Sequence, residues 1–141
     1  MTYALDVSVA LCWVISRPLT PKALRLRDEY RRQLHELIAP AHFPFEIASA
    51  LTKAERQKLI PAGDARPLIQ DVLATPPALH AIDPLFYRAV DISSKTRSGF
   101  YDCLYVALAE REGCQFVTTD DRLVRNLQRQ FPFVISLASL P

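Results

Sequence analysis

The sequence is poor in the residues that mark secreted, zinc-binding or membrane proteins. Its three cysteines lie in apolar runs without Cys-x-x-Cys spacing, which favours reduced thiols in the core of a cytoplasmic protein. Its three histidines are far apart and show no zinc-type spacing. No run approaches the roughly 20 apolar residues needed to cross a bilayer, and the first residues lack the charged segment of a signal peptide. We therefore expect a cytoplasmic protein with no membrane partner.

The chain also lacks a strong charge of either sign. Its 17 lysines and arginines face 15 aspartates and glutamates, so the formal net charge is only +2. Any nucleic-acid binding therefore has to come from local patches and not from a basic whole. A length of 141 residues, half of them apolar, suits one domain with one packed core over residues 1–141.

Strands and helices are expected to alternate along the chain. Short apolar or alternating segments predict strands, and apolar residues at i, i+3, i+4 and i+7 predict helices. The expected strands are 3–5, 37–40, 78–82, 115–118 and 133–136, and the expected helices are 7–15, 22–36, 45–58, 63–74, 84–94, 100–112 and 122–130. This alternation predicts an α/β fold, a mostly parallel central sheet of four to five strands with helices on both faces.

The sequence does contain four acidic residues that each lie at the start or the end of a predicted helix or strand. Asp6 and Asp120 follow apolar strands, whereas Glu46 and Asp102 open apolar helical runs. Sites in open parallel sheets form outside the carboxyl ends of strands, and acids among apolar neighbours need neutralisation. An all-oxygen set suits Mg²⁺, with Mn²⁺ as a plausible substitute. The four acids are therefore predicted to be the ligands of a metal site at this edge of the sheet.

Polar residues beside these acids are candidates for supporting roles. Ser8 and Thr118 can hydrogen-bond the carboxylates or bound waters, and Asp121 can reach the metal through a water. Arg97, Arg122 and Arg125 are cations close in sequence to Asp102 or Asp120.

Each acid also has a purely structural interpretation. Asp6 and Asp120 can cap helices, and Glu46 and Asp102 can favour the dipoles of the helices that they open. Exposed arginines are often only a solvated face. Trp13 can stack on a base, although packing is the commoner role. No one of these readings explains all four acids together.

Four segments resemble the motifs of PIN-domain ribonucleases and occur in the order found in that family. They are residues 5–10 (LDVSVA), 44–51 (PFEIASAL), 101–109 (YDCLYVALA) and 117–123 (VTTDDRL). Size and motif density are most similar to those of the VapC toxins of bacterial toxin–antitoxin pairs. The resemblance implies a PIN fold, a metal-dependent endoribonuclease acting on RNA, a cognate VapB-like antitoxin and a homodimer. It also implies that the four acids are catalytic, because their metal would activate water against phosphodiesters. Candidates for contacts to RNA phosphates are then Arg97, Arg122 and Arg125.

Two further functions are compatible with the same fold. One is a PIN nuclease that processes RNA without being a toxin, and the other is a catalytically inactive PIN module that binds a partner. Response-regulator receivers pair acids after the first strand, and aspartyl phosphatases need Asp-x-Asp there. Asp6 is followed by Val7 and Ser8, so both of these classes are disfavoured.

Overall fold

The computed structural model describes all 141 residues. One sheet of five strands has the order β3-β2-β1-β4-β5, and all four strand pairings are parallel. The predicted parallel α/β sheet is thereby confirmed. The strands are β1 (Thr2–Leu5), β2 (Glu36–Pro40), β3 (Ala78–His80), β4 (Gln115–Thr118) and β5 (Val134–Ser136).

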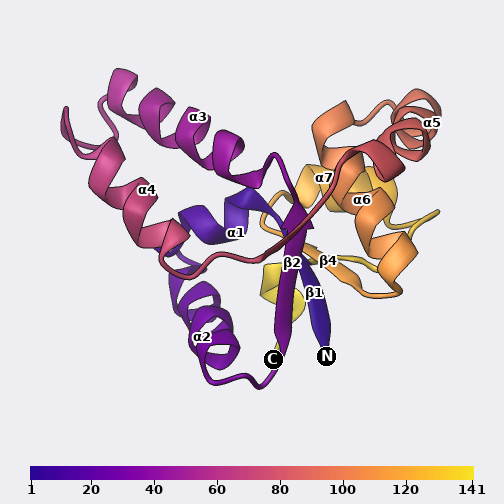
Figure 1. Cartoon of the computed structure of the whole chain (residues 1–141), viewed down its shortest axis with the longest axis horizontal. Helices are drawn as coiled ribbons and strands as arrows, with labels where there is room; N and C mark the ends of the chain where they lie inside the picture. Colours follow the sequence, from indigo (N-terminus) through magenta and orange to yellow (C-terminus); the bar gives the residue numbers. More distant parts are fainter.

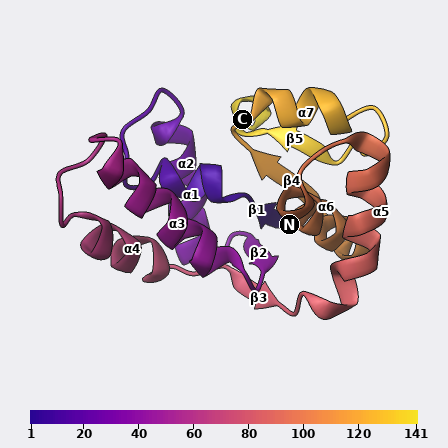
Figure 2. The same cartoon turned by 90° about the horizontal axis from the view of Figure 1, so that it is seen from above.

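Helices cover both faces of this sheet. They are α1 (Val7–Leu11), α2 (Thr20–Arg31), α3 (Phe43–Arg56), α4 (Ala65–Leu73), α5 (Phe86–Thr96), α6 (Phe100–Glu112) and α7 (Asp121–Leu127), with 3-10 turns η1 (Asp83–Leu85) and η2 (Leu137–Ser139). Helices α1 to α4 lie on one side of the strands, whereas α5 and α6 lie on the other (Figures 1 and 2). Helix α7 lies beside β5 (Figure 2). The sheet is therefore the middle of three layers.

Helix α6 is the central helix of its layer. Its residues 103–109 are all buried, and it contacts β1, β2 and β4. A helix that is apolar on every side is expected in the interior. The first turn of α6 is less deeply buried and carries Asp102. The core thus holds α6 firmly while its amino end reaches the molecular surface.

Helices α1 and α2 end four or more residues earlier than the sequence predicts. Helix α1 ends at Leu11, because the chain continues in tighter turns in which Cys12 and Trp13 donate to carbonyls three residues back. Helix α2 ends at Arg31, since Gln33 adopts a positive φ of 62° that reverses the chain. The chain is then free for Glu36 to pair with Thr2.

Trp13 is a packing residue in this fold. Its ring is 7% exposed, its Nε1 donates to the Ala23 carbonyl at 2.9 Å, and the Arg27 guanidinium lies 4.6 Å from the ring centre. All three cysteines are free thiols; Cys12 and Cys103 are buried. None of the helices has the length and apolar character needed to span a membrane.

The strand order reverses between β1 and β4. From β1 the chain moves outward to β2 and β3, and the later strands β4 and β5 lie on the opposite side of β1. The Asp6 amide donates to the Val117 carbonyl at 3.1 Å, which joins the carboxyl ends of the two central strands. A crevice at such a reversal is the usual ligand site of an open parallel sheet.

Candidate active site

Asp6 is buried at the point between β1 and β4 where the strand order reverses. It follows β1 directly and is 7% exposed. Its Oδ2 accepts hydrogen bonds from Ser8 Oγ at 2.6 Å and Thr118 Oγ1 at 2.7 Å. Burial raises the pKa of Asp6, and the two hydroxyls oppose that rise. The Asp6 side chain makes no capping bond to α1, so helix capping does not account for it.

The two hydroxyls are themselves oriented by the end of β4. Ser8 Oγ accepts from the Thr119 amide at 3.0 Å, and Thr118 Oγ1 accepts from the Asp120 amide at 3.0 Å. Each hydroxyl therefore has its proton free to point at Asp6. This arrangement holds the carboxylate of Asp6 in place without an arginine or lysine.

Asp120 lies in the turn between β4 and α7 and is exposed. Its Oδ1 accepts from the Leu123 amide at 3.1 Å, which caps α7. The structural role considered for Asp120 is therefore real. One oxygen serves the cap, so the other remains for a ligand. Asp121, the first residue of α7, is also exposed.

Glu46 approaches the same edge from the first turn of α3. Its Oε1 accepts from the Tyr105 hydroxyl at 2.8 Å. The Nε2 of buried His42 lies 2.9 Å from the same oxygen, but outside hydrogen-bonding geometry, so that contact is electrostatic. Burial and the nearby Glu46 carboxylate raise the pKa of Tyr105, which keeps its hydroxyl protonated as the donor.

Asp102 stands in the first turn of α6. Its pKa is raised from 3.8 to about 7, most by burial and then by the charges of Asp6, Glu46 and Asp120 in that order, whereas His42 opposes the rise. The repulsion shows that the four acids share one electrostatic environment. Figure 1 shows that α3 and α6, which carry Glu46 and Asp102, lie on opposite sides of the strands.

The acids surround this edge without forming a finished metal cage. Three of the acids, Asp6, Glu46 and Asp120, use one carboxylate oxygen to accept hydrogen bonds from the protein. Their second oxygen accepts none from a side chain. No three acidic, histidine or cysteine side chains already stand at the spacing that a shared metal ion requires. The donor set is all oxygen, which fits a hard cation such as Mg²⁺.

A cavity of about 220 Å³ opens beside Asp102 and Asp120. Two of the predicted RNA-binding residues, Arg97 and Arg122, line it together with Ser98. Arg125 is exposed on α7 and is not among the lining residues. The cavity thus brings two carboxylates and two guanidinium groups together.

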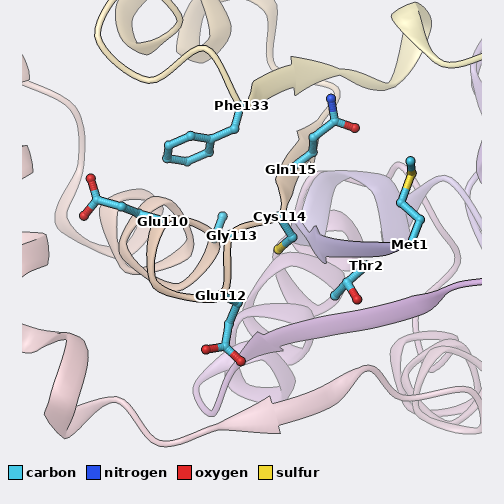
Figure 3. A pocket seen from close by; sticks show the side chains of 9 residues that line it. Met1, Thr2, Glu110, Glu112, Gly113, Cys114, Gln115 and Phe133 are labelled. Atoms are coloured by element: carbon cyan, nitrogen blue, oxygen red, sulfur yellow. The ribbon is translucent and has the colours of Figure 1, made fainter.

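A larger cavity, of about 540 Å³, lies at the opposite edge of the sheet (Figure 3). Residues from the start of β1, the start of β4 and the end of α6 line it. Its carboxylates are already paired, Glu110 with Arg88 at 2.7 Å and Glu112 with Arg111 at 3.1 Å. Size alone therefore does not mark the candidate site, because the predicted acids Asp102 and Asp120 line the smaller cavity.

Two residues of the site were missed by sequence reasoning. His42 was weighed only as a zinc ligand, yet it precedes Glu46 by four residues, the spacing of helix neighbours. Tyr105 lies three residues after Asp102, and stacking on Phe116 hides it in the core. Helical spacing from each acid was the signal that could have found both.

A family model described as PIN domain matches residues 3–127. The chain belongs to the PIN-domain family. Among its relatives, ribonuclease VapC12 of Mycobacterium tuberculosis is 32% identical over 123 residues, which cover 86% of this chain and 89% of VapC12. Ribonuclease VapC9 of the same organism is 33% identical over 116 residues, covering 80% and 90%. The match to ribonuclease VapC3, 33% identical over 87 residues, spans only 62% of that protein.

Solved structures share this PIN fold. The crystal structure of PAE2754 from Pyrobaculum aerophilum matches with a TM-score of 0.71 and 20% identity, covering 99% of this chain and 94% of that chain. VapBC2 from Rickettsia felis, solved bound to a DNA fragment from their promoter, matches with a TM-score of 0.64 and 12% identity, covering 96% and 97%. At these identities the likeness concerns the fold alone.

Proposed function

We propose that this chain is a metal-dependent endoribonuclease of the VapC type, the toxin of a toxin–antitoxin pair. The observation that carries the proposal is the convergence of four carboxylates at one sheet edge, close enough for three of them to raise the pKa of Asp102. The PIN family and the relatives named ribonuclease support the same activity. The relatives named ribonuclease VapC favour the toxin over the other two PIN functions.

Asp6, Glu46, Asp102 and Asp120 are the proposed ligands of Mg²⁺, for which Mn²⁺ is a plausible substitute. A bound cation of this kind lowers the pKa of a coordinated water and stabilises the charge that develops on the phosphate. Ser8 and Thr118 keep Asp6 oriented, and Tyr105 does the same for Glu46. Asp121 is proposed to act only through water.

RNA is the proposed substrate, and its backbone is the part that the site recognises. Phosphate contacts made by arginine supply affinity without sequence information. Arg97 and Arg122 stand beside the carboxylates in the small cavity, so they are the preferred candidates. Arg125 can reach only RNA that passes over the outer face of α7.

A VapB-like antitoxin and a homodimer complete the proposal. The structural neighbour named VapBC2 supports the antitoxin. An exposed apolar group on α5 supports the dimer; Phe86, Tyr87 and Val90 are 43%, 78% and 39% exposed. Large exposed apolar groups of this kind are typical of association surfaces. A cytoplasmic location belongs to the same proposal.

The deciding experiment uses purified, antitoxin-free protein and total cellular RNA. Incubation in Mg²⁺ or Mn²⁺ is followed by mapping of new 5′ ends. We expect discrete new ends that EDTA abolishes and that Asp102→Asn reduces at least about 100-fold, since its carboxylate is a proposed ligand.

A matched variant controls for loss of any negative charge. Asp91→Asn changes an exposed acid on α5 that makes no hydrogen bond, so it should cleave as the parent does. No new ends from folded protein, or equal cleavage by Asp102→Asn, would refute the endoribonuclease proposal. Growth arrest on expression then separates a toxin from an RNA-processing enzyme.

A further inference from the structure

We propose that the cavity between the α5–α6 link and α7 binds a backbone phosphate of single-stranded RNA, next to the phosphate that is cleaved. The inference rests on the proposed nuclease function and adds to it a specific subsite. Three side chains supply the donors: Arg97 and Ser98 from the link, and Arg122 from α7. The two acids of the cavity, Asp102 and Asp120, face the cleavage site.

The charges of the cavity are unpaired, which is the first support for a phosphate. Arg97 and Arg122 line the same cavity as Asp102 and Asp120, yet all six ion pairs of the molecule involve other residues. Arginine and carboxylate side chains this near one another usually pair, because the bidentate bond is favourable. Here the guanidinium groups remain available for an anion, and the carboxylates for a cation.

Ser98 supplies the second, independent observation. It is 7% exposed, lines the cavity, and its Oγ has no hydrogen-bond partner. Buried hydroxyls are nearly always satisfied, so an unsatisfied one calls for an explanation. The Oγ atom itself is enclosed, so a rotation of the Ser98 side chain toward the cavity would let a phosphate oxygen accept its proton. A bound ligand would therefore supply the hydrogen-bond acceptor that the protein does not offer to this hydroxyl.

The link that carries Arg97 and Ser98 is rigid. The Ser98 carbonyl accepts from Ser93 Oγ at 2.6 Å, and the Arg97 amide donates to the Ser93 carbonyl at 2.9 Å. The Cys103 amide donates to the Gly99 carbonyl at 3.0 Å. These bonds hold the backbone of the link in place, whereas the Ser98 hydroxyl has no partner within the protein. Preorganised donors of this kind bind without a further ordering cost.

The test measures binding separately from cleavage. The probe is a short fluorescein-labelled oligouridylate, bound in Ca²⁺ in place of Mg²⁺, with gels to show that it stays intact. Binding constants are determined over a range of salt concentrations. The salt slope is the steepness with which log K falls against the logarithm of the salt concentration. For a single strand, each lost phosphate contact reduces this steepness by about 0.7. We expect that decrease in Arg97→Gly and in Arg122→Ala, with roughly 10-fold weaker binding in each.

Lys58→Gly is a well-matched control for Arg97→Gly. Its φ is 62°, and Lys58 has a φ of 59° at the end of α3, far along that helix from Glu46. Glycine suits both backbones, so Arg97→Gly and Lys58→Gly each remove one cation without backbone strain. Only Arg97→Gly should change the salt slope by the value of a phosphate contact. Equal slopes in the two variants would overturn the subsite.

Ser98→Ala tests the hydroxyl in a way that a structural role would not mimic. Removing an unsatisfied buried hydroxyl leaves stability unchanged or improves it. We expect an unchanged or higher Tm together with a roughly fivefold loss of oligouridylate affinity. Ser94→Ala, at an exposed position on α5, should alter neither. A fall in Tm with unchanged affinity would remove Ser98 from the subsite.

The outcomes for the subsite and for the nuclease can be told apart. If the parent cleaves RNA and Arg97→Gly binds and cleaves equally well, the subsite is wrong and the nuclease stands. If the parent does not cleave RNA but shows the arginine-dependent slope, the nuclease is wrong and the phosphate site stands. Absence of both binding and cleavage in folded parent protein overturns both.

Discussion

Asp102 differs from the other three acids in its lack of a hydrogen-bond partner. Asp6 has two hydroxyls, Glu46 has Tyr105, and Asp120 has the Leu123 amide. Nothing comparable offsets the burial of Asp102, and the neighbouring carboxylates repel its charge. Its pKa of about 7 therefore makes the metal-free protein sensitive to pH in the neutral range.

The first prediction concerns Asp102→Asn without metal. A carboxyl whose pKa rises from 3.8 to about 7 on folding binds more protons folded than unfolded, so parent stability falls as pH rises between these values. The variant should be more stable than the parent at pH 8, by roughly 1–2 kcal/mol after solvent screening is allowed for.

Denaturant unfolding in EDTA at several pH values measures this difference. The advantage of Asp102→Asn should shrink as the pH falls below about 7 and vanish near pH 4, where both states of the parent carboxyl bind a proton. Asp91→Asn, exposed on α5, should show no such trend. An advantage that grows toward acid pH would contradict the assigned repulsion.

Among the elements, α7 depends on a residue that also belongs to the site. Asp120 caps α7 through Oδ1, and α7 brings Arg122 to the small cavity. One carboxylate thus orders the helix with one oxygen and is proposed to bind a cation with the other. The two roles can be separated because asparagine also caps helices well.

The second prediction compares two substitutions of Asp120. Asp120→Asn keeps a cap acceptor and loses the charge, so stability should change by less than about 0.5 kcal/mol while RNA cleavage falls sharply. Asp120→Ala loses both, and it should cost about 1 kcal/mol in addition. Unfolding in EDTA and cleavage assays in Mg²⁺ measure the two effects. Full cleavage by Asp120→Asn would leave capping as the only role of this residue.

The elements best predicted from the sequence are those with a local boundary signal. Helix α6 and strand β4 have the expected bounds, Phe100–Glu112 and Gln115–Thr118, because Gly99 and Gly113 bracket a continuous apolar helix. The end of α2 was not predictable, since the positive φ of Gln33 has no glycine to mark it.

The placement of the acids was predictable to the level of the sheet edge. Apolar strands that end in Asp6 and near Asp120 place both at carboxyl ends, whatever the sequence of the loops. The contact between Tyr105 and Glu46 was not predictable in the same way. Tyr105 reaches Glu46 across 59 positions of sequence, a contact fixed only when α3 and α6 pack on opposite sides of the sheet.

For the whole molecule, the four acids join its three layers. Asp6 and Asp120 follow strands β1 and β4, Glu46 belongs to α3 and Asp102 to α6. Helices α3 and α6 lie on opposite sides of the sheet (Figure 2). Without a cation the carboxylates repel each other and oppose this assembly. A cation bound by all four would turn that repulsion into attraction and couple the layers.

The third prediction is therefore a global stabilisation by Mg²⁺. A ligand at 100 times its Kd stabilises the folded state by about 2.7 kcal/mol, which should raise Tm by roughly 5–10 °C in a chain of this size. Asp6→Asn should abolish most of this shift, whereas Asp91→Asn should retain it. Thermal unfolding with and without Mg²⁺ measures both. An equal Tm shift in Asp6→Asn would contradict a cation site at Asp6. The buried Asp6 carboxylate would then contribute nothing to the binding of the cation.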